Sequence, residues 1–266
     1  MELSKNRKKL VMRLRNPRFR PREGLFLVEG VKGSREVLRA SPSLSARFAM
    51  VSPKLESTLE GEEMGSLLSQ GSIPVERISE KEMGELADTR APQGLILVVE
   101  EPTHSLGDLG RFSDLRLLLL DGIQDPGNAG TLIRSARALG AQGILALEGT
   151  VDLWNPKVVR STAGAFAHIP LLNTPWSMVA EWLGGHGIPL LVADPRGEDA
   201  RSFRPPPSWA LALGNEGGGL RKELLTHAEK TLAIPMVPGA DSLNAGVAGS
   251  ILLFALTSSL DTDGEA

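Results

Sequence analysis

The amino-acid sequence predicts an α/β protein whose C-terminal half forms a mostly parallel sheet. Short, continuous apolar runs such as LRLLLLD (115–121) are typical of strands that are buried on both faces. Helical stretches alternate with these runs, which favours parallel pairing. The 266 residues suffice for about two domains. A hydrophobic share of 41% and a charged share of 23% are ordinary for a folded chain, so wholesale disorder is excluded.

The N-terminal part predicts a small α/β unit of its own. Its expected strands are 25–30, 47–52 and 94–100, and its expected helices are 31–40 and 80–90. Residues 101–113 contain Pro and Gly without an apolar period and are interpreted as a linker. The predicted domains are therefore 1–100 and 114–266.

The second half alternates strands and helices in the same way. Its expected strands are 115–121, 143–148, 167–172, 188–194, 208–214 and 231–234, and its expected helices are 131–140, 176–185, 220–229 and 244–260. In the first of these helices the apolar residues share one face, and Arg134 and Arg137 lie away from it. The last helix is apolar on nearly every face, so it must be buried against the sheet or against a second subunit.

Composition and charge exclude several functions. No apolar run is long enough to span a bilayer and the first residues do not resemble a signal peptide, so we expect a cytoplasmic protein. The chain has no cysteine, and its four histidines have no metal-site spacing, so we expect no metal.

Residues 1–22 hold nine basic residues against Glu2 alone. This basic arm either attracts phosphate or is merely a solvated helix or frayed end, and the sequence leaves both readings open.

Three Gly-rich loops follow predicted strands, at 121–136, 211–220 and 234–246. Ligands of open parallel sheets bind at the carboxyl ends of the strands, so these loops are the candidate site. The P-loop pattern GxxxxGK[ST] is absent, and GxGxxG does not follow the first strand of this half. A P-loop enzyme and a nicotinamide-dependent dehydrogenase are therefore disfavoured.

The segments NAGTLIRSARALGA (128–141), LALGNEGGGL (211–220) and IPMVPGADSLNAGVAG (234–249) resemble, in order and spacing, the three signature motifs of the SpoU/TrmH family. This family comprises RNA ribose 2′-O-methyltransferases of the SPOUT superfamily. Residues 24–100 are similar to the small substrate-binding domain that often precedes its catalytic domain. The resemblance implies a SPOUT-type parallel sheet with a trefoil knot, which residue patterns alone would not predict because knots are so rare.

The resemblance also implies a cofactor, S-adenosyl-L-methionine, and a set of site residues. The cofactor-binding residues it implies are Gly214, Ile234, Met236, Gly239 and Leu243. The polar active-site residues it implies are Asn128, Arg134, Glu216, Ser242 and Asn244. The family mechanism makes Arg134 a general base, but a guanidinium hardly loses its proton, so a clamp on the adjacent phosphate is the alternative role. For Glu216, Ser242 and Asn244, capping of turns is the alternative to contact with RNA.

The expected partners are RNA and a second copy of the chain. Ribosomal RNA is the preferred substrate, and the alternatives are a tRNA ribose 2′-O-methyltransferase or a catalytically inactive RNA-binding relative. A homodimer is expected because the family's cofactor site lies beside a dimer interface and because the last helix is so apolar.

Ala245, Gly246 and Gly249 depart from the family's bulkier or hydroxylated residues, which puts the helix start and the cofactor affinity in question. Aromatic residues are only 4%, so charge and shape rather than stacking should dominate RNA recognition.

Overall fold

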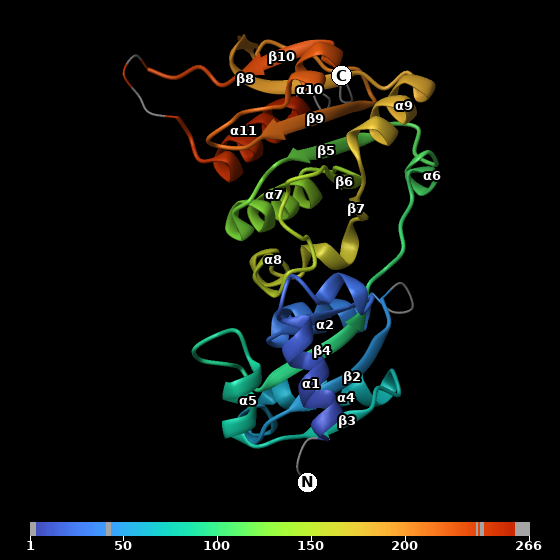
Figure 1. Ribbon diagram of the computed structural model, residues 1–266, viewed down its shortest axis with the longest axis vertical. Coiled ribbons are helices and arrows are strands. Elements are labelled where there is room, and N and C mark those ends of the chain that lie inside the picture. Colours follow the sequence, from blue (N-terminus) through green and yellow to red (C-terminus); the bar gives the residue numbers. More distant parts are fainter. Residues whose placement is uncertain (1–3, 41–43, 238, 240–241, 259–266) are drawn as a thin grey trace, which may run out of the picture. The chain divides into compact units, whose positions relative to one another are not determined.

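The computed structural model describes residues 4–40, 44–237, 239 and 242–258, and its contacts divide the chain into two compact units (Figure 1). Unit 1 contains residues 1–103 together with 154–168, and unit 2 contains residues 104–153 together with 169–266. The sequence analysis predicted two domains that are each continuous in sequence. In the structure, unit 1 also includes a segment from the second half of the chain. Residues 154–168 lie in the second half of the sequence but pack within unit 1.

Unit 1 is built on a four-stranded mixed sheet in the order β1-β4-β2-β3. Its strands are β1 (Leu25–Glu29), β2 (Ala46–Val51), β3 (Val75–Arg77) and β4 (Leu95–Glu100). Its helices before residue 103 are α1 (Lys5–Leu14), α2 (Val31–Arg39), α3 (Pro53–Glu56), α4 (Leu59–Gln70) and α5 (Glu80–Leu86), with a 3-10 turn at Arg20–Arg22. Strand β4 pairs antiparallel with β1 and β2, and β3 adds in parallel to β2. The sequence analysis did not predict α4, which contains two glycines and buries only Met64 and Leu68.

Residues 154–168, which come from the second half of the chain, complete the core of unit 1. They contain α8 (Pro156–Ser161) and a 3-10 turn at Ala165–His168. Trp154 and Phe166 are buried against Phe26 of β1, with ring centroids 4.5 and 5.7 Å from the Phe26 ring. Such aromatic contacts dominate core energetics, so unit 1 depends on residues far along the chain.

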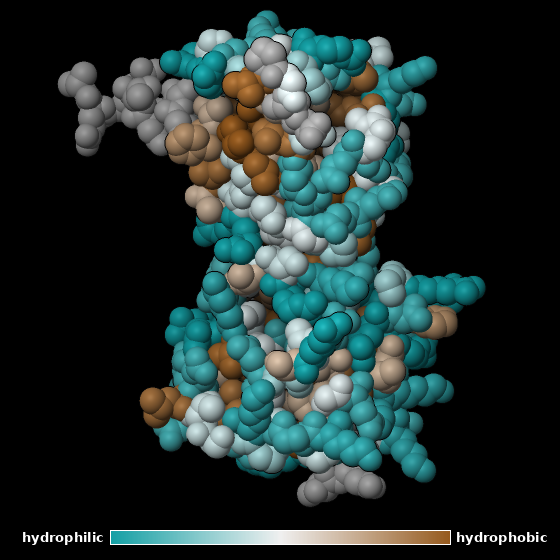
Figure 2. Space-filling view, turned by 90° about the vertical axis from the view of Figure 1, so that its left-hand side faces the viewer, coloured by the Kyte–Doolittle hydropathy of each residue, from teal (hydrophilic) through white to brown (hydrophobic). Residues whose placement is uncertain are grey.

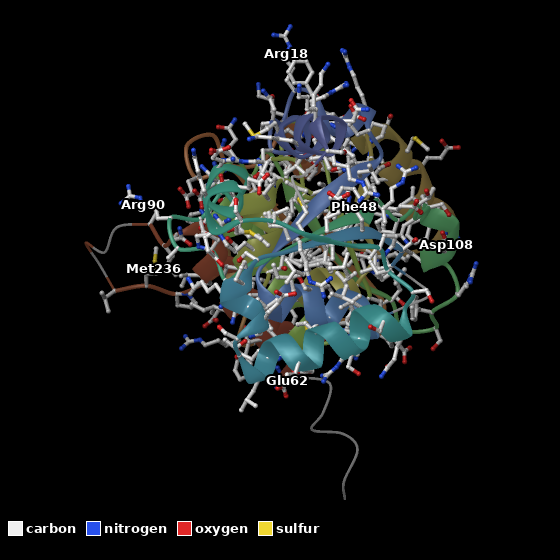
Figure 3. The ribbon with its side chains drawn as sticks, turned by 90° about the horizontal axis from the view of Figure 1, so that it is seen from below. Arg18, Phe48, Glu62, Arg90, Asp108 and Met236 are labelled. Carbon is white, nitrogen blue, oxygen red and sulfur yellow. The ribbon has the colours of Figure 1, made fainter. Side chains whose placement is uncertain are left out.

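The basic residues 1–22 do not form a free arm. Helix α1 buries Val11 and Leu14 completely in the unit 1 core. Five of the nine basic side chains are paired with carboxylates, in the pairs Arg7–Glu76, Lys8–Glu85, Arg13–Glu23, Arg15–Asp88 and Arg20–Glu101. The other four, Lys5, Lys9, Arg18 and Arg22, form no ion pair with any residue that the structure describes, and Arg18 points into solvent (Figure 3). Of the nine basic side chains in residues 1–22, four therefore have no carboxylate partner among the described residues and are available to phosphate.

Unit 2 is built on a six-stranded sheet in the order β10-β8-β9-β5-β6-β7, in which every neighbouring pair is parallel. Its strands are β5 (Arg116–Asp121), β6 (Gly143–Ala146), β7 (Leu171–Asn173), β8 (Leu190–Asp199), β9 (Trp209–Gly214) and β10 (Lys230–Ala233). Its helices are α6 (Leu106–Leu109), α7 (Pro126–Ala138), α9 (Trp176–His186), α10 (Lys222–His227) and α11 (Ala245–Ser258). The predicted α/β class with a parallel sheet is confirmed.

Two helices of unit 2 differ in length from the prediction. Helix α7 begins at Pro126, five residues before the expected start, because Asp125 caps it by accepting the Asn128 N–H at 2.8 Å and Pro126 occupies the first helical position. Asn128 therefore lies in the first turn of a helix and not in a loop. Helix α11 spans Ala245–Ser258, and the last two residues of the expected range, 259 and 260, lie outside the described residues. No helix in the described part of the chain is long and apolar enough to cross a membrane.

Gly249 explains one departure from the family pattern. A Cβ atom at this position would lie 2.3 Å from side-chain atoms of both Leu132 and Leu213. Helix α11 can therefore rest on α7 and β9 only because residue 249 has no side chain. The small residue is required by packing.

Replacing Leu14 tests whether α1 is part of the core. Leu14→Ala should lower the free energy of unfolding by about 2–5 kcal/mol, because it leaves a cavity beneath a side chain that is fully buried. Urea unfolding measures this change. Met12→Ala on the same helix, where the side chain is 48% exposed, is the control and should cost little. Equal, small effects would mean that α1 does not support the unit.

Candidate active site

The three predicted loops meet at the carboxyl edge of the unit 2 sheet. Strands β5 and β9 are neighbours in register, with Asp121 opposite Gly214, so the chain leaves both at the same edge. The first loop enters α7, the second follows β9, and the third follows β10 and enters α11. This is the edge at which parallel sheets bind ligands.

One carboxylate joins residues from all three motifs. Glu216 Oε1 accepts hydrogen bonds from Asn128 Nδ2 at 2.6 Å and from Asn244 Nδ2 at 3.1 Å. It also accepts the backbone N–H of Ala245, the first residue of α11, at 3.1 Å. Asn244 Nδ2 donates in addition to Asn128 Oδ1 at 2.8 Å. The three side chains thus form one closed network at the start of α11.

The loop that carries Glu216 is fixed at both ends. Asn215 and Gly219 exchange backbone hydrogen bonds of 3.1 and 2.8 Å, and a Cβ at Gly214 would lie 2.3 Å from the Gly219 backbone. At the far end, the Arg221 N–H and its Nε both donate to the buried Asp121 carboxylate, at 2.8 and 2.6 Å. The glycine after β9 therefore permits a tight turn, and the Arg221 ion pair holds that turn against the end of β5.

A cavity of about 290 Å³ lies beside this network. Four of the five predicted cofactor-binding residues line it, namely Gly214, Ile234, Met236 and Leu243. The fifth, Gly239, does not line the cavity and lies in a turn with a φ of 82°. Leu213, Leu232 and Leu252 supply apolar walls. Most of the residues that line the cavity are thus small or apolar, and most come from the second and third predicted loops.

Asp194 adds a fixed negative charge to the cavity wall. Side-chain and backbone hydrogen bonds from Arg196, all at 2.9 Å, lower the pKa of Asp194 to about 2. The carboxylate therefore stays ionised at every pH above that value. The sequence analysis missed this residue, although it is the last residue of the predicted strand 188–194 and the strand-end rule could have found it.

The remaining predicted polar residues lie apart from the network. Ser242 lines the cavity, and its side chain forms no hydrogen bond with the described residues. Arg134 is exposed on α7 and likewise forms no hydrogen bond or ion pair with the described part of the chain. Its guanidinium is consequently open to a ligand. The structure brings Asn128, Glu216 and Asn244 together but leaves Arg134 outside their hydrogen bonds.

Residues 116–254 match the SpoU rRNA Methylase family, and residues 5–97 match the MRM3-like substrate binding domain. The chain belongs to the SpoU rRNA methylase family. It is therefore an RNA 2′-O-ribose methyltransferase, as its sequence predicted.

Relatives match nearly the whole chain. The Bacillus subtilis 23S rRNA (guanosine(2553)-2′-O)-methyltransferase RlmP is 30% identical, with 96% of this chain and 98% of that protein covered. The Streptomyces viridochromogenes 23S rRNA (uridine(2479)-2′-O)-methyltransferase is 31% identical over 91% of this chain and 85% of that protein. Among solved structures, the SpoU methyltransferase AviRb from S. viridochromogenes, in complex with AdoMet, has a TM-score of 0.85 at 27% identity and covers 97% of this chain and 98% of that one. These likenesses confirm the SPOUT-type fold, and the knot itself stays a prediction.

Proposed function

We propose that this protein transfers a methyl group from S-adenosylmethionine to a ribose 2′-hydroxyl of ribosomal RNA, with the cofactor held in the cavity beside Glu216. The observation that carries the proposal is the meeting of Asn128, Glu216 and Asn244, one from each family motif, next to that cavity. Relatives that match along the whole chain methylate 23S rRNA, which favours ribosomal over transfer RNA. The intact motif residues argue against an inactive relative.

The cavity suits this cofactor in size and in its polar groups. Its volume is close to the lower end of the range for small-molecule pockets, and the two glycines in its lining, Gly214 and Gly219, allow close backbone approach. S-adenosylmethionine carries a positive ammonium that needs acceptors, and the Asp194 carboxylate, whose charge is balanced by Arg196, presents acceptor oxygens at the cavity wall. When bound, the cofactor supplies an electrophilic methyl group. The chain's own residues then have to hold and orient the ribose hydroxyl.

Two roles remain for Arg134. A guanidinium that forms no internal ion pair stays available to a phosphate beside the reacting ribose, which it can bind through two parallel hydrogen bonds. It can also stabilise the developing alkoxide, and neither action requires loss of its proton. We favour these roles over that of a general base.

The functional form in this proposal is a cytoplasmic homodimer. Helix α11 leaves Val247, Ile251 and Phe254 exposed along one stripe, with 61% of Phe254 open to solvent. Figure 2 views the molecule from the side of α11 and shows hydrophobic side chains gathered on unit 2. An apolar stripe at this spacing favours burial against an equivalent helix of a second copy.

The substrate is tested by mapping 2′-O-methyl groups in RNA from cells with and without the gene. We expect a methylated position of ribosomal RNA to lose its modification when the gene is absent. A loss confined to transfer RNA would instead support the tRNA alternative. Unchanged methylation in both RNA classes would contradict the proposed function.

Arg134→Ala should reduce turnover by at least about a hundredfold, the usual scale for loss of one positioned catalytic group. Binding of S-adenosylmethionine, measured by calorimetry, should not change. Arg137→Ala is the matched control, since it removes an exposed arginine one turn further along α7. A nearly inactive Arg134→Lys enzyme would indicate a geometric clamp, and rescue by lysine would indicate simple charge stabilisation. Close to parental turnover in Arg134→Ala would refute a catalytic role.

Phe254→Glu should convert the dimer to monomers at micromolar concentration, because it places a charge in the middle of the apolar stripe. Light scattering reports the mass. Leu59→Glu provides the control, since Leu59 of α4 is 84% exposed but lies in unit 1. A parental protein that is monomeric and fully active would contradict the dimer.

A further inference from the structure

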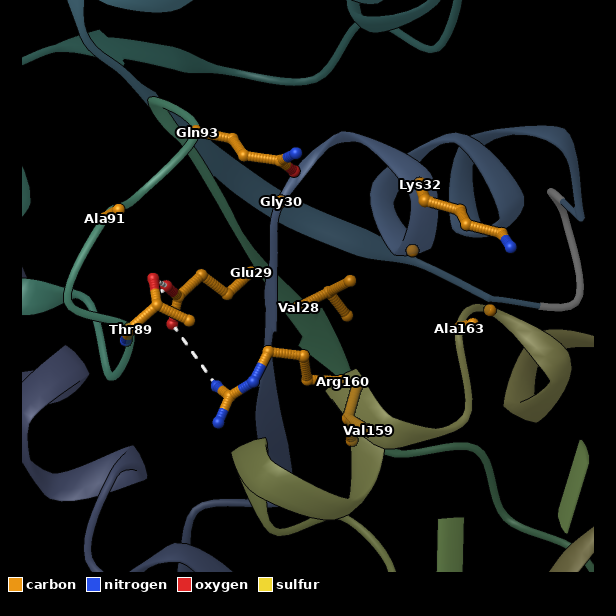
Figure 4. A pocket seen from close by; sticks show the side chains of 12 residues that line it. Val28, Glu29, Gly30, Lys32, Thr89, Ala91, Gln93, Val159, Arg160 and Ala163 are labelled. Carbon is orange, nitrogen blue, oxygen red and sulfur yellow. Dashed lines mark hydrogen bonds and ion pairs between the residues drawn. The ribbon is translucent and has the colours of Figure 1, made fainter. Parts of the chain in front are cut away.

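Unit 1 contains a second cavity, of about 330 Å³, which no residue of the methyl-transfer motifs lines (Figure 4). It is formed by the end of β1 and the start of α2, by the loop before β4, and by α8. Its volume lies within the usual range for ligand pockets. Since α8 comes from the second half of the chain, the cavity exists only when that segment has joined unit 1.

The acidic group of this cavity is already fully engaged. The Glu29 side chain is only 7% exposed and accepts the backbone N–H groups of Asp88 and Thr89, at 2.8 and 3.2 Å, as well as the Thr89 hydroxyl. Arg160 faces Glu29 at 3.8 Å, as Figure 4 shows, and pairs with Asp88 at 3.0 Å. The carboxylates are therefore not open to a ligand.

The open side-chain groups of the cavity are hydrogen-bond donors. Gln93 uses its Oε1 to accept the Val31 N–H at 3.0 Å, and its amide NH₂ has no acceptor among the described residues. The ammonium of Lys32, at the rim, likewise has no partner in the described chain. Arg160 Nη1 is buried and has no hydrogen bond to any described residue, but it is not an open donor, since it forms the 3.8 Å ion pair with Glu29. Gln93 and Lys32 are exposed, so their donors are accessible to a ligand that brings acceptors.

Gly30 makes this arrangement of Gln93 possible. Its φ is 92°, and a Cβ at this position would lie 2.6 Å from Gln93 Oε1. The glycine thus lets the Gln93 carbonyl reach the first N–H of α2, which leaves the amide NH₂ as the free end of the side chain.

We propose that this cavity binds one unpaired nucleotide of the RNA substrate, and this inference rests on the proposed function. Val28, Val159 and Ala163 give the cavity apolar walls for a base, and Gln93 and Lys32 offer donors to base carbonyl and phosphate oxygens. A base with an acceptor-rich edge, uracil or guanine, fits donors better than adenine or cytosine. A duplex does not fit, because its bases are stacked and paired.

Gln93→Glu in the full-length chain tests the proposal with almost no change in shape. The new carboxylate can still accept the Val31 N–H, and a negative charge suits a helix N-terminus, so the melting temperature should not fall. The donor NH₂ becomes an anionic acceptor, however. Affinity for single-stranded oligo(U) of about a dozen nucleotides, measured by fluorescence anisotropy, should fall roughly tenfold or more. Lys32→Gln should weaken the same binding and flatten its salt dependence.

Two matched variants control for charge and chemistry. Gln70→Glu makes the same change on exposed α4, and Lys81→Gln removes an exposed lysine of α5, so neither should alter oligo(U) affinity. Oligo(C) and a duplex of equal length should bind more weakly than oligo(U) to the parental protein. Parental affinity in a stably folded Gln93→Glu protein, or equal binding of duplex and single strand, would overturn the nucleotide site. If the parental protein neither binds nor methylates any RNA, the proposed function fails instead.

Discussion

A single carboxylate oxygen, Oε1 of Glu216, holds the methyltransferase site together. It accepts hydrogen bonds from Asn128, Asn244 and the first N–H of α11, so the start of α7, the loop after β9 and the start of α11 share one acceptor. The arrangement needs the tight turn at Gly214, the Arg221–Asp121 ion pair and the bare Cα of Gly249. Each of these features constrains backbone position at the cavity beside Glu216.

Much of this architecture could be read from residue patterns. Runs of consecutive apolar residues such as 117–120 identify the buried parallel strands, since a sheet covered on both faces tolerates them. The meeting of Asn128, Glu216 and Asn244 followed from motif resemblance, because their hydrogen bonds join residues about a hundred apart in sequence. Patterns failed where packing is non-local. The apolar spacing of Val11 and Leu14 was passed over in favour of the charge around them, whereas the return of 154–168 to unit 1 leaves no periodic signal. The contact of Trp154 with Phe26 cannot be seen in either segment alone.

Two relatives of nearly equal identity, at 30% and 31%, carry names that specify guanosine in one and uridine in the other. The chemistry at a ribose hydroxyl is the same whichever base is attached. Within the described residues, unit 1 presents a cavity and, in residues 1–22, four cations without a carboxylate partner, whereas the hydrogen-bonded residues of the three motifs belong to unit 2. This separation underlies the proposal that unit 1 contributes to recognition of the RNA.

The presence of residues 154–168 in unit 1 also affects how the protein folds during its synthesis. The core of unit 1 contains Phe26 from its first strand and Trp154 and Phe166 from a segment translated well over a hundred residues later. At ordinary rates of synthesis that interval is on the order of ten seconds. During this time the nascent N-terminal sheet must wait with an uncovered aromatic face, which exposes it to aggregation or to chaperones. Unit 1, although it begins the chain, is thus complete only after residue 168, when the first part of unit 2 has already been synthesised.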